Sequence, residues 1–168
     1  MSKYKVLLAD DDESLRIILT ESLLRSGYEV ISLKNSNELM SEVKSGRGDI
    51  ILTDVIMPDG DGIDLIPKIN KLRQDLPIIV MSARSNLLTA IRSNKEGAFD
   101  YLPKPFDIND LLNIIKRALH SKLKNNNEIH NNDTEDIFSL IGNSKSMQDV
   151  YKIISKVMSN DLSILITG

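Results

Sequence analysis

The sequence contains no cysteine, no long apolar run and no block of charge of one sign. Without cysteine the chain cannot form disulfides, use a thiolate nucleophile or bind zinc through thiolates, and this composition is typical of a reducing cytoplasm. No apolar stretch is long enough to span a bilayer, and the first residues lack the apolar region of a signal peptide. We therefore expect a soluble, cytoplasmic protein. The formal net charge of −3 indicates no nucleic-acid partner, although it leaves a local basic face open.

Short apolar runs alternate with helical patterns along most of the chain. The 168 residues, 41% hydrophobic and 27% charged, suit one compact domain with a smaller additional part. Five apolar runs are predicted to be strands, over residues 5–9, 28–33, 50–54, 78–81 and 99–102. A helical segment follows each of them. Because a crossover between parallel strands must pass over a face of the sheet, this alternation predicts a parallel α/β sheet with helices on both faces.

The five helical segments are recognised by apolar residues that recur every three or four positions, as Leu15, Ile18, Leu19 and Leu23 do in the first. Ser36 or Asn37 is expected to cap the second helix, and Asp107 the fifth. Gly27 and Gly97 are expected to end the first and the fourth. The Lys104–Pro105 bond, with prolines on both sides of the lysine, is a candidate for the cis form.

Acidic residues stand at the ends of two predicted strands. Asp10, Asp11, Asp12 and Glu13 follow the first strand, and Asp54 ends the third. One acid would suffice to cap the following helix, whereas adjacent carboxylates repel each other and raise each other's pKa unless a cation holds them. The cluster therefore favours a hard divalent metal ion. Asp54 is a candidate nucleophile or metal ligand, and the alternative is that it only caps the following turn.

A serine and a lysine stand at the ends of the fourth and fifth strands. Ser82 can hydrogen-bond a group bound at the site, or it can simply satisfy the local backbone. Lys104 has a restricted backbone that aims its ammonium group, and a solvated surface lysine is the common alternative. Because parallel strands end at one edge of the sheet, both residues are expected to meet the acids there. Their joint placement outweighs the separate alternatives.

These motifs together resemble the receiver domain of two-component response regulators, over about residues 4–122. The resemblance rests on residues 9–12, 54–62, 81–83 and 97–106. It implies a flavodoxin-like, doubly wound sheet of five parallel strands in the order 2-1-3-4-5, with five helices. It also implies a signalling domain, not an enzyme, that takes a phosphoryl group from a sensor histidine kinase in a phosphorelay.

The resemblance implies that Asp54 is the phosphoacceptor. Asp11 would bind Mg²⁺ directly and Asp10 directly or through water. Asp54 itself and the backbone carbonyl of Ile56 would complete the protein ligands.

Three further roles are implied by the resemblance. Ser82 and Lys104 would contact the oxygens of the phosphoryl group, and Tyr101 would be the aromatic switch residue. Movement of Ser82 and Lys104 would let Tyr101 turn inward and change the face made by the fourth helix, fifth strand and fifth helix. That face would be the output surface and a candidate surface for homodimer formation.

The composition changes after the fifth helix. Residues 123–139 are polar and predict a flexible linker, which leaves residues 1–122 as the receiver. His120 and His130 have no companion ligands, and we expect both to be solvated. Residues 140–168 resemble the opening of the AAA+ ATPase domain of sigma-54-dependent activators of the NtrC/NtrX group, which implies an output in transcription regulation.

In that resemblance Gly168 would be the first glycine of the phosphate loop. The lysine of the loop and a DNA-binding helix-turn-helix are not seen in the sequence. We therefore expect neither ATP binding nor direct DNA binding from this chain, and we expect residues 140–168 to be poorly ordered or to dock on a partner.

Two other classes of function stay open at this point. A phosphatase of the haloacid dehalogenase type would also use an aspartyl phosphate. Resemblance to that family requires a second acid two residues after the nucleophile, and this chain has Ile56 there. The other alternative is a dimerisation scaffold, built on the fifth helix and the linker, whose acidic cluster is silent.

Overall fold

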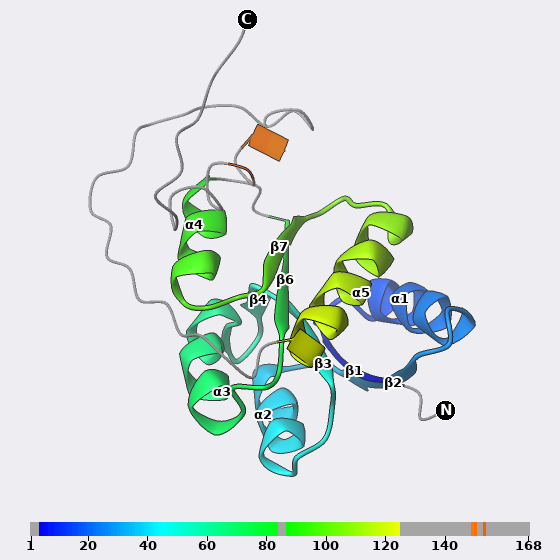
Figure 1. Ribbon diagram of the computed structural model, residues 1–168, viewed down its shortest axis with the longest axis horizontal. Helices are drawn as coiled ribbons and strands as arrows, with labels where there is room; N and C mark the ends of the chain where they lie inside the picture. Colours follow the sequence, from blue (N-terminus) through cyan, green and yellow to red (C-terminus); the bar gives the residue numbers. More distant parts are fainter. Residues whose placement is uncertain (1–3, 84–86, 125–148, 151–152, 154–168) are drawn as a thin grey trace, which may run out of the picture.

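The computed structural model describes residues 4–83, 87–124, 149–150 and 153 (Figure 1). Its main sheet contains five strands, β1 (Lys5–Ala9), β2 (Glu29–Leu33), β3 (Ile50–Asp54), β6 (Ile78–Ser82) and β7 (Asp100–Pro103). They lie in the order β2-β1-β3-β6-β7, and all four neighbouring pairs are parallel. Counted along these five strands, this is the order 2-1-3-4-5, so the predicted flavodoxin-like topology is confirmed.

Helices cover both faces of this sheet. They are α1 (Glu13–Arg25), α2 (Ser36–Lys44), α3 (Ile66–Leu72), α4 (Leu87–Lys95) and α5 (Ile108–Lys124). Figure 1 shows α1 and α5 side by side on one side of the sheet, with α2, α3 and α4 on the other. The short 3-10 helix η1 (Ile63–Leu65) leads into α3, and β4 (Ile56–Met57) and β5 (Gly60–Asp61) form a small antiparallel pair just before it.

Alternate residues of the strands pack into two separate apolar clusters. Leu7 and Ile51 join the cluster under α2, α3 and α4, whereas Leu8 and Leu52 join the cluster under α1 and α5. All four side chains are fully buried. Burying an aliphatic side chain of this size contributes about 1.5–3 kcal/mol, so the two clusters fix the central strands and hence the positions of their carboxyl ends.

The N-cap of α2 differs from the prediction. The cap is Asn35, whose Oδ1 accepts a hydrogen bond from the backbone N–H of Glu38 at 2.8 Å. Ser36 and Asn37, the predicted caps, already lie inside the helix. Their backbone N–H groups donate to the two carboxylate oxygens of Asp59 at 2.8 and 2.9 Å. A side chain from a distant turn therefore completes the start of this helix.

Other local predictions can be compared with the structure. The Lys104–Pro105 bond is cis, and Asp107 accepts a hydrogen bond from the backbone of Asn109 at the start of α5. Ile18 is 56% exposed, although its spacing matched the buried face of α1. Helix α5 continues to Lys124.

Most of the predicted linker, including His130, lies outside the described residues, as does most of residues 140–168. Residues 149, 150 and 153 of that second segment are helical. In the part of the chain that the structure describes, no helix is both long enough and apolar enough to cross a bilayer.

Candidate functional site

The carboxyl edge of the sheet brings together three aspartates. One carboxylate oxygen from each of Asp10, Asp11 and Asp54 lies within 4.8 Å of the others. Asp10 is fully buried and Asp54 is 7% exposed, while Asp11 faces solvent. Three converging carboxylates, one of them open to water, are a donor set that suits Mg²⁺, a hard cation that prefers oxygen ligands and keeps several waters. Asp10, Asp11 and Asp54 are thus the residues that could hold such an ion.

Lys104 connects two of these acids. Its Nζ lies 2.6 Å from Asp10 Oδ2 and 2.8 Å from Asp54 Oδ2. Burial raises the pKa of Asp10; the hydrogen bond from Lys104 opposes this shift, and the charge of Asp54 adds to it. Burial alone would lower the pKa of Lys104, but its hydrogen bonds to Asp10 and Asp54 outweigh burial and raise it. Lys104 therefore keeps its positive charge beside Asp54.

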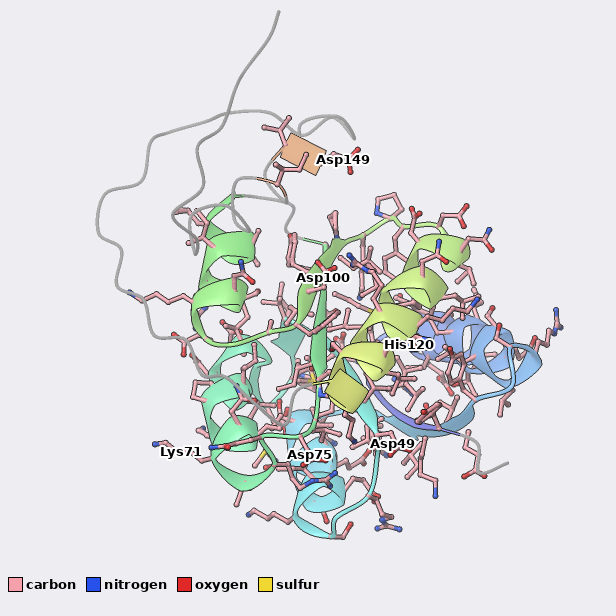
Figure 2. All side chains as sticks on the ribbon, in the orientation of Figure 1. Asp49, Lys71, Asp75, Asp100, His120 and Asp149 are labelled. Atoms are coloured by element: carbon pink, nitrogen blue, oxygen red, sulfur yellow. The ribbon has the colours of Figure 1, made fainter. Side chains whose placement is uncertain are left out.

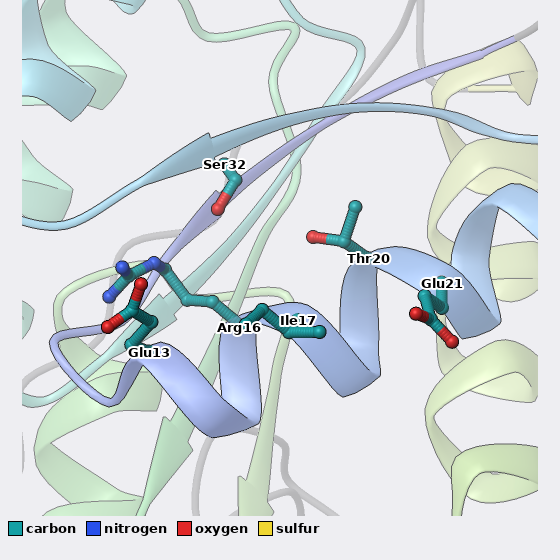
Figure 3. Close-up of a pocket in the computed structure, with 6 residues that line it drawn as sticks. All are labelled: Glu13, Arg16, Ile17, Thr20, Glu21 and Ser32. Atoms are coloured by element: carbon teal, nitrogen blue, oxygen red, sulfur yellow. The ribbon is translucent and has the colours of Figure 1, made fainter.

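The loop between β1 and α1 uses a different acid as the helix cap. Asp12 is the N-cap of α1, and its side chain accepts a hydrogen bond from the backbone N–H of Leu15 at 3.0 Å. Arg16 donates to the backbone oxygens of Asp10 and Asp11 at 2.7 and 3.1 Å. Figure 3 shows Arg16 at the start of α1, in a hollow that it lines together with Glu13 and Ser32. Because Asp12 caps the helix, the side chains of Asp10 and Asp11 are not needed for that purpose.

Ser82 and Tyr101 form a buried pair behind Lys104. Ser82 is fully buried, Tyr101 is 7% exposed, and their hydroxyl groups are hydrogen-bonded. Burial raises the pKa of Tyr101 to about 12, and the hydrogen bond with Ser82 opposes part of that shift. The backbone N–H of Lys104 donates to the Ser82 carbonyl at 2.8 Å. The side chain of Tyr101, for which the resemblance implies a switch role, is turned inward in this structure.

Comparison with known proteins identifies the family. The family model described as the response regulator receiver domain matches residues 6–116. The chain belongs to this family.

Curated relatives resemble the whole chain. Proteins named DNA-binding transcriptional regulator NtrC, from Azospirillum brasilense and from Rhizobium meliloti (strain 1021), are 44% and 42% identical to it over its full length. The chain spans 35% and 34% of the length of these two relatives, about a third. It is therefore an NtrC-like receiver with a short following segment, and it corresponds to a minor part of the longer regulators.

Solved structures agree with this family. A CheY-like receiver domain from Methanospirillum hungatei JF-1 superposes with a TM-score of 0.70 at 29% identity, over 73% of this chain and 98% of that one. The beryllofluoride-activated NtrC4 receiver domain dimer superposes with a TM-score of 0.68 at 34% identity, over 70% of this chain and 98% of that one.

The receiver's phosphoacceptor candidate, Asp54, sits in a tightly fitted loop. The backbone N–H of Val55 donates to the Met81 carbonyl at 3.0 Å, and Gly62 donates to the Val55 carbonyl at 2.7 Å. A Cβ on Gly62 would collide with the backbone oxygen of Asp54, so this position has no room for a side chain. The N–H of Ile56 points to Asp54 Oδ1 at 3.4 Å. Ile56, whose carbonyl is the remaining predicted metal ligand, therefore lies directly beside the acids.

Two features of this receiver were not found from the sequence. Arg92 of α4 contacts Asp61 and Asp64 in the segment after Asp54, and Asp59 holds the start of α2. No local pattern marks these contacts, because each joins residues more than 20 positions apart. His120, by contrast, is exposed on α5, as expected (Figure 2).

Proposed function

We propose that this NtrC-like receiver accepts a phosphoryl group on Asp54 from a sensor histidine kinase. The observation that carries this proposal is the position of Lys104, whose ammonium group contacts Asp54 Oδ2 and Asp10 Oδ2 together. A buried carboxylate held beside one fixed cation and two further acids is arranged for nucleophilic attack on a phosphorus atom with charge compensation nearby.

The proposed reaction is an in-line transfer. An oxygen of Asp54 attacks the phosphorus of the phosphohistidine, the P–O bond forms as the P–N bond breaks, and the imidazole nitrogen of the kinase leaves with the electron pair. Lys104 pairs with the developing charge on the phosphoryl oxygens. Mg²⁺, held by Asp10, Asp11, Asp54 and the Ile56 carbonyl, would supply further neutralisation of that charge.

The acyl phosphate would act on the switch residues. Ser82 and Lys104 would turn toward the new anionic oxygens, and Tyr101 would be held inward beneath α4. Phosphorylation would raise the population of the state in which Tyr101 is turned inward. The output surface would be formed by α4, β7 and α5. A homodimer through this face is proposed by analogy with the NtrC4 receiver, which was solved as a dimer.

We further propose the setting of this domain. The receiver would cover residues 1–122, with a flexible linker over 123–139 and the start of a sigma-54-type AAA+ domain over 140–168. The NtrC relatives, named as DNA-binding transcriptional regulators, support a role in transcription regulation, which this domain would carry out in the cytoplasm. The domain would be a phosphoacceptor and not a turnover phosphatase, because Ile56 stands where a haloacid dehalogenase would carry its second acid.

Intact-protein mass spectrometry tests this proposal. The chain is incubated with acetyl phosphate and Mg²⁺, alongside Asp54→Asn and the control Asp110→Asn, which changes an exposed acid on α5. We expect one phosphoryl adduct on the wild type and on Asp110→Asn, dependent on Mg²⁺, and none on Asp54→Asn. A folded wild type that takes up no phosphoryl group would overturn the proposal and favour the dimerisation scaffold with a silent acidic cluster.

A further inference from the structure

Arg92 joins α4 to the segment that follows the phosphoacceptor candidate. Its Nη1 lies 2.7 Å from Asp61 Oδ2, and its Nη2 lies 2.5 Å from Asp64 Oδ1. Asp61 ends the small strand β5, and Asp64 lies in η1. The two terminal nitrogens of the Arg92 guanidinium group thus contact carboxylates on two successive elements. Because this group is planar and its N–H groups have fixed directions, it restrains the orientation of α4 better than an ammonium group would.

Asp61 is in turn connected to the acidic cluster. In the antiparallel pair β4–β5 it stands opposite Ile56, whose N–H points to Asp54 Oδ1 at 3.4 Å. The second carboxylate oxygen of Asp61 accepts the N–H of Ile63 at 2.8 Å. One carboxylate oxygen of Asp61 therefore accepts a hydrogen bond from its own loop, and the other contacts Arg92. A continuous set of contacts leads from α4 through Arg92 and Asp61 to Ile56.

The far end of α4 is held on the same side. The side-chain amide of Asn70, in α3, donates to the backbone oxygen of Glu96 at 3.4 Å. Gly97 follows the helix with φ +94°, and a Cβ there would lie 2.7 Å from the side-chain nitrogen of Asn70. The C-terminal end of α4 is thus tied to α3, while Arg92 ties the helix to β5 and η1.

We propose that Arg92 is a positioning residue that couples the placement of α4 to Mg²⁺ binding at the acidic cluster. A cation held by the Ile56 carbonyl would restrain β4. Through the pairing of β4 with β5 it would also restrain Asp61 and, through Arg92, α4. Linkage requires the converse too: a docked α4 raises the affinity for the cation. This route is separate from the Ser82–Tyr101 pair. The inference rests on the proposed function, since it assumes that Mg²⁺ binds at the acidic cluster.

The first test is an Mg²⁺ titration of the ¹⁵N-labelled, full 168-residue chain, followed by amide chemical shifts. The variants are Arg92→Gln and Arg92→Lys, with the control Arg25→Gln, which removes an exposed α1 arginine paired with Glu21. The partners of Arg92 are partly solvated, so we expect Arg92→Gln to raise the Mg²⁺ dissociation constant about two- to five-fold. Arg92→Lys should recover part of the loss, because an ammonium group can reach one carboxylate, and the control should match the wild type.

A double-variant series separates coupling from general loosening. Asp61→Asn alone should weaken Mg²⁺ binding less than Arg92→Gln does, because Arg92 keeps its contact with Asp64. The double variant should show no loss beyond that of Arg92→Gln, because Arg92→Gln already removes the contact with Asp61. Hydrogen exchange supplies the second readout. In the wild type, Mg²⁺ should slow exchange of the α4 amides, and in Arg92→Gln it should not. A purely structural role would change the baseline exchange and leave the response to Mg²⁺ intact.

The possible outcomes distinguish this inference from the proposed function. If the wild type binds Mg²⁺ and Arg92→Gln shows the same dissociation constant and the same α4 response, the coupling is refuted while the metal site stands. If the wild type shows no shift with Mg²⁺ at millimolar concentrations, the metal site itself is refuted and the coupling with it.

Discussion

Replacing Lys104 by methionine tests how the acidic cluster is held together. The change keeps a long, unbranched side chain and removes the ammonium group that lies 2.6 Å from Asp10 and 2.8 Å from Asp54. Asp10 is fully buried and Asp54 nearly so, whereas the Lys104 side chain is 16% exposed. The variant therefore leaves two carboxylates facing each other with little water and no cation.

The expected loss of stability follows from this burial. Removing one partner of a buried ion pair costs about 3–5 kcal/mol, because the remaining charge is uncompensated. Here the solvent that reaches the Lys104 position offsets part of that cost. Asp10, whose pKa is already raised by burial, can also take up a proton. We therefore expect Lys104→Met to lower the free energy of unfolding at pH 7 by about 2–4 kcal/mol.

Lys122→Met is the matched control. Lys122 also contacts two aspartates, Asp75 at 3.2 Å and Asp49 at 3.8 Å, but these side chains are 49% and 38% exposed. Solvated pairs of this kind contribute about 1 kcal/mol or less. Urea unfolding followed by far-UV circular dichroism, without divalent cations, compares the two variants. If Lys104→Met were no less stable than Lys122→Met, Lys104 would not be needed to offset the repulsion between Asp10 and Asp54, and this interpretation of the acidic cluster would be wrong.

Three further changes have defined expectations. Gly62→Ala places a Cβ against the backbone oxygen of Asp54, and we expect it to lower the free energy of unfolding by about 1–3 kcal/mol in the same urea assay; an unchanged midpoint would contradict the close approach. Asp59→Ala removes the acceptor of two N–H groups at the start of α2 and should cost about 0.5–1 kcal/mol, with Asp59→Asn retaining part of the stability. Tyr101 has its pKa raised to about 12 by burial, so its contribution to stability is complete below pH 10 and is lost as the pH rises toward 12. Two pKa units correspond to about 2–3 kcal/mol, so wild type should lose that much more stability than Tyr101→Phe between pH 10 and 12, and parallel pH profiles would contradict a buried hydroxyl.

The fold and the residues at the edge of the sheet could be predicted because their signals are local. Each apolar run is short and is followed at once by a polar residue, and in a parallel sheet all these strand ends meet at one edge. Asp10, Asp54 and Lys104 come together for this reason, although they are up to 94 positions apart in the chain. A divalent metal site could then be predicted, because adjacent carboxylates repel each other unless a cation lies between them.

The features that were missed depend on contacts between distant residues. Asn35, Ser36 and Asn37 are all residues that cap helices well, and the choice of Asn35 is fixed by Asp59, which occupies the next two N–H groups. The contact of Arg92 with Asp61 likewise joins residues 31 positions apart. Sequence periodicity gives the face of a helix on which a residue lies, but not its partner on another element.

The orientation of Tyr101 was a third feature beyond the sequence pattern. A tyrosine in a short edge strand can turn toward solvent or toward the sheet, and both fit the same alternation. In its inward position it packs in the apolar cluster under α2, α3 and α4 and is hydrogen-bonded to Ser82 of the neighbouring strand β6.

The central claim, that Asp54 is the phosphoacceptor, is tested most directly by trapping the acyl phosphate. Reduction of an aspartyl phosphate with borohydride converts that residue to homoserine, which peptide mass spectrometry can locate in the digested chain. After incubation with acetyl phosphate and Mg²⁺, we predict homoserine at position 54 and at no other aspartate, with none formed when Mg²⁺ is withheld. Homoserine at Asp10 or Asp11, or its absence from a folded chain, would contradict the claim.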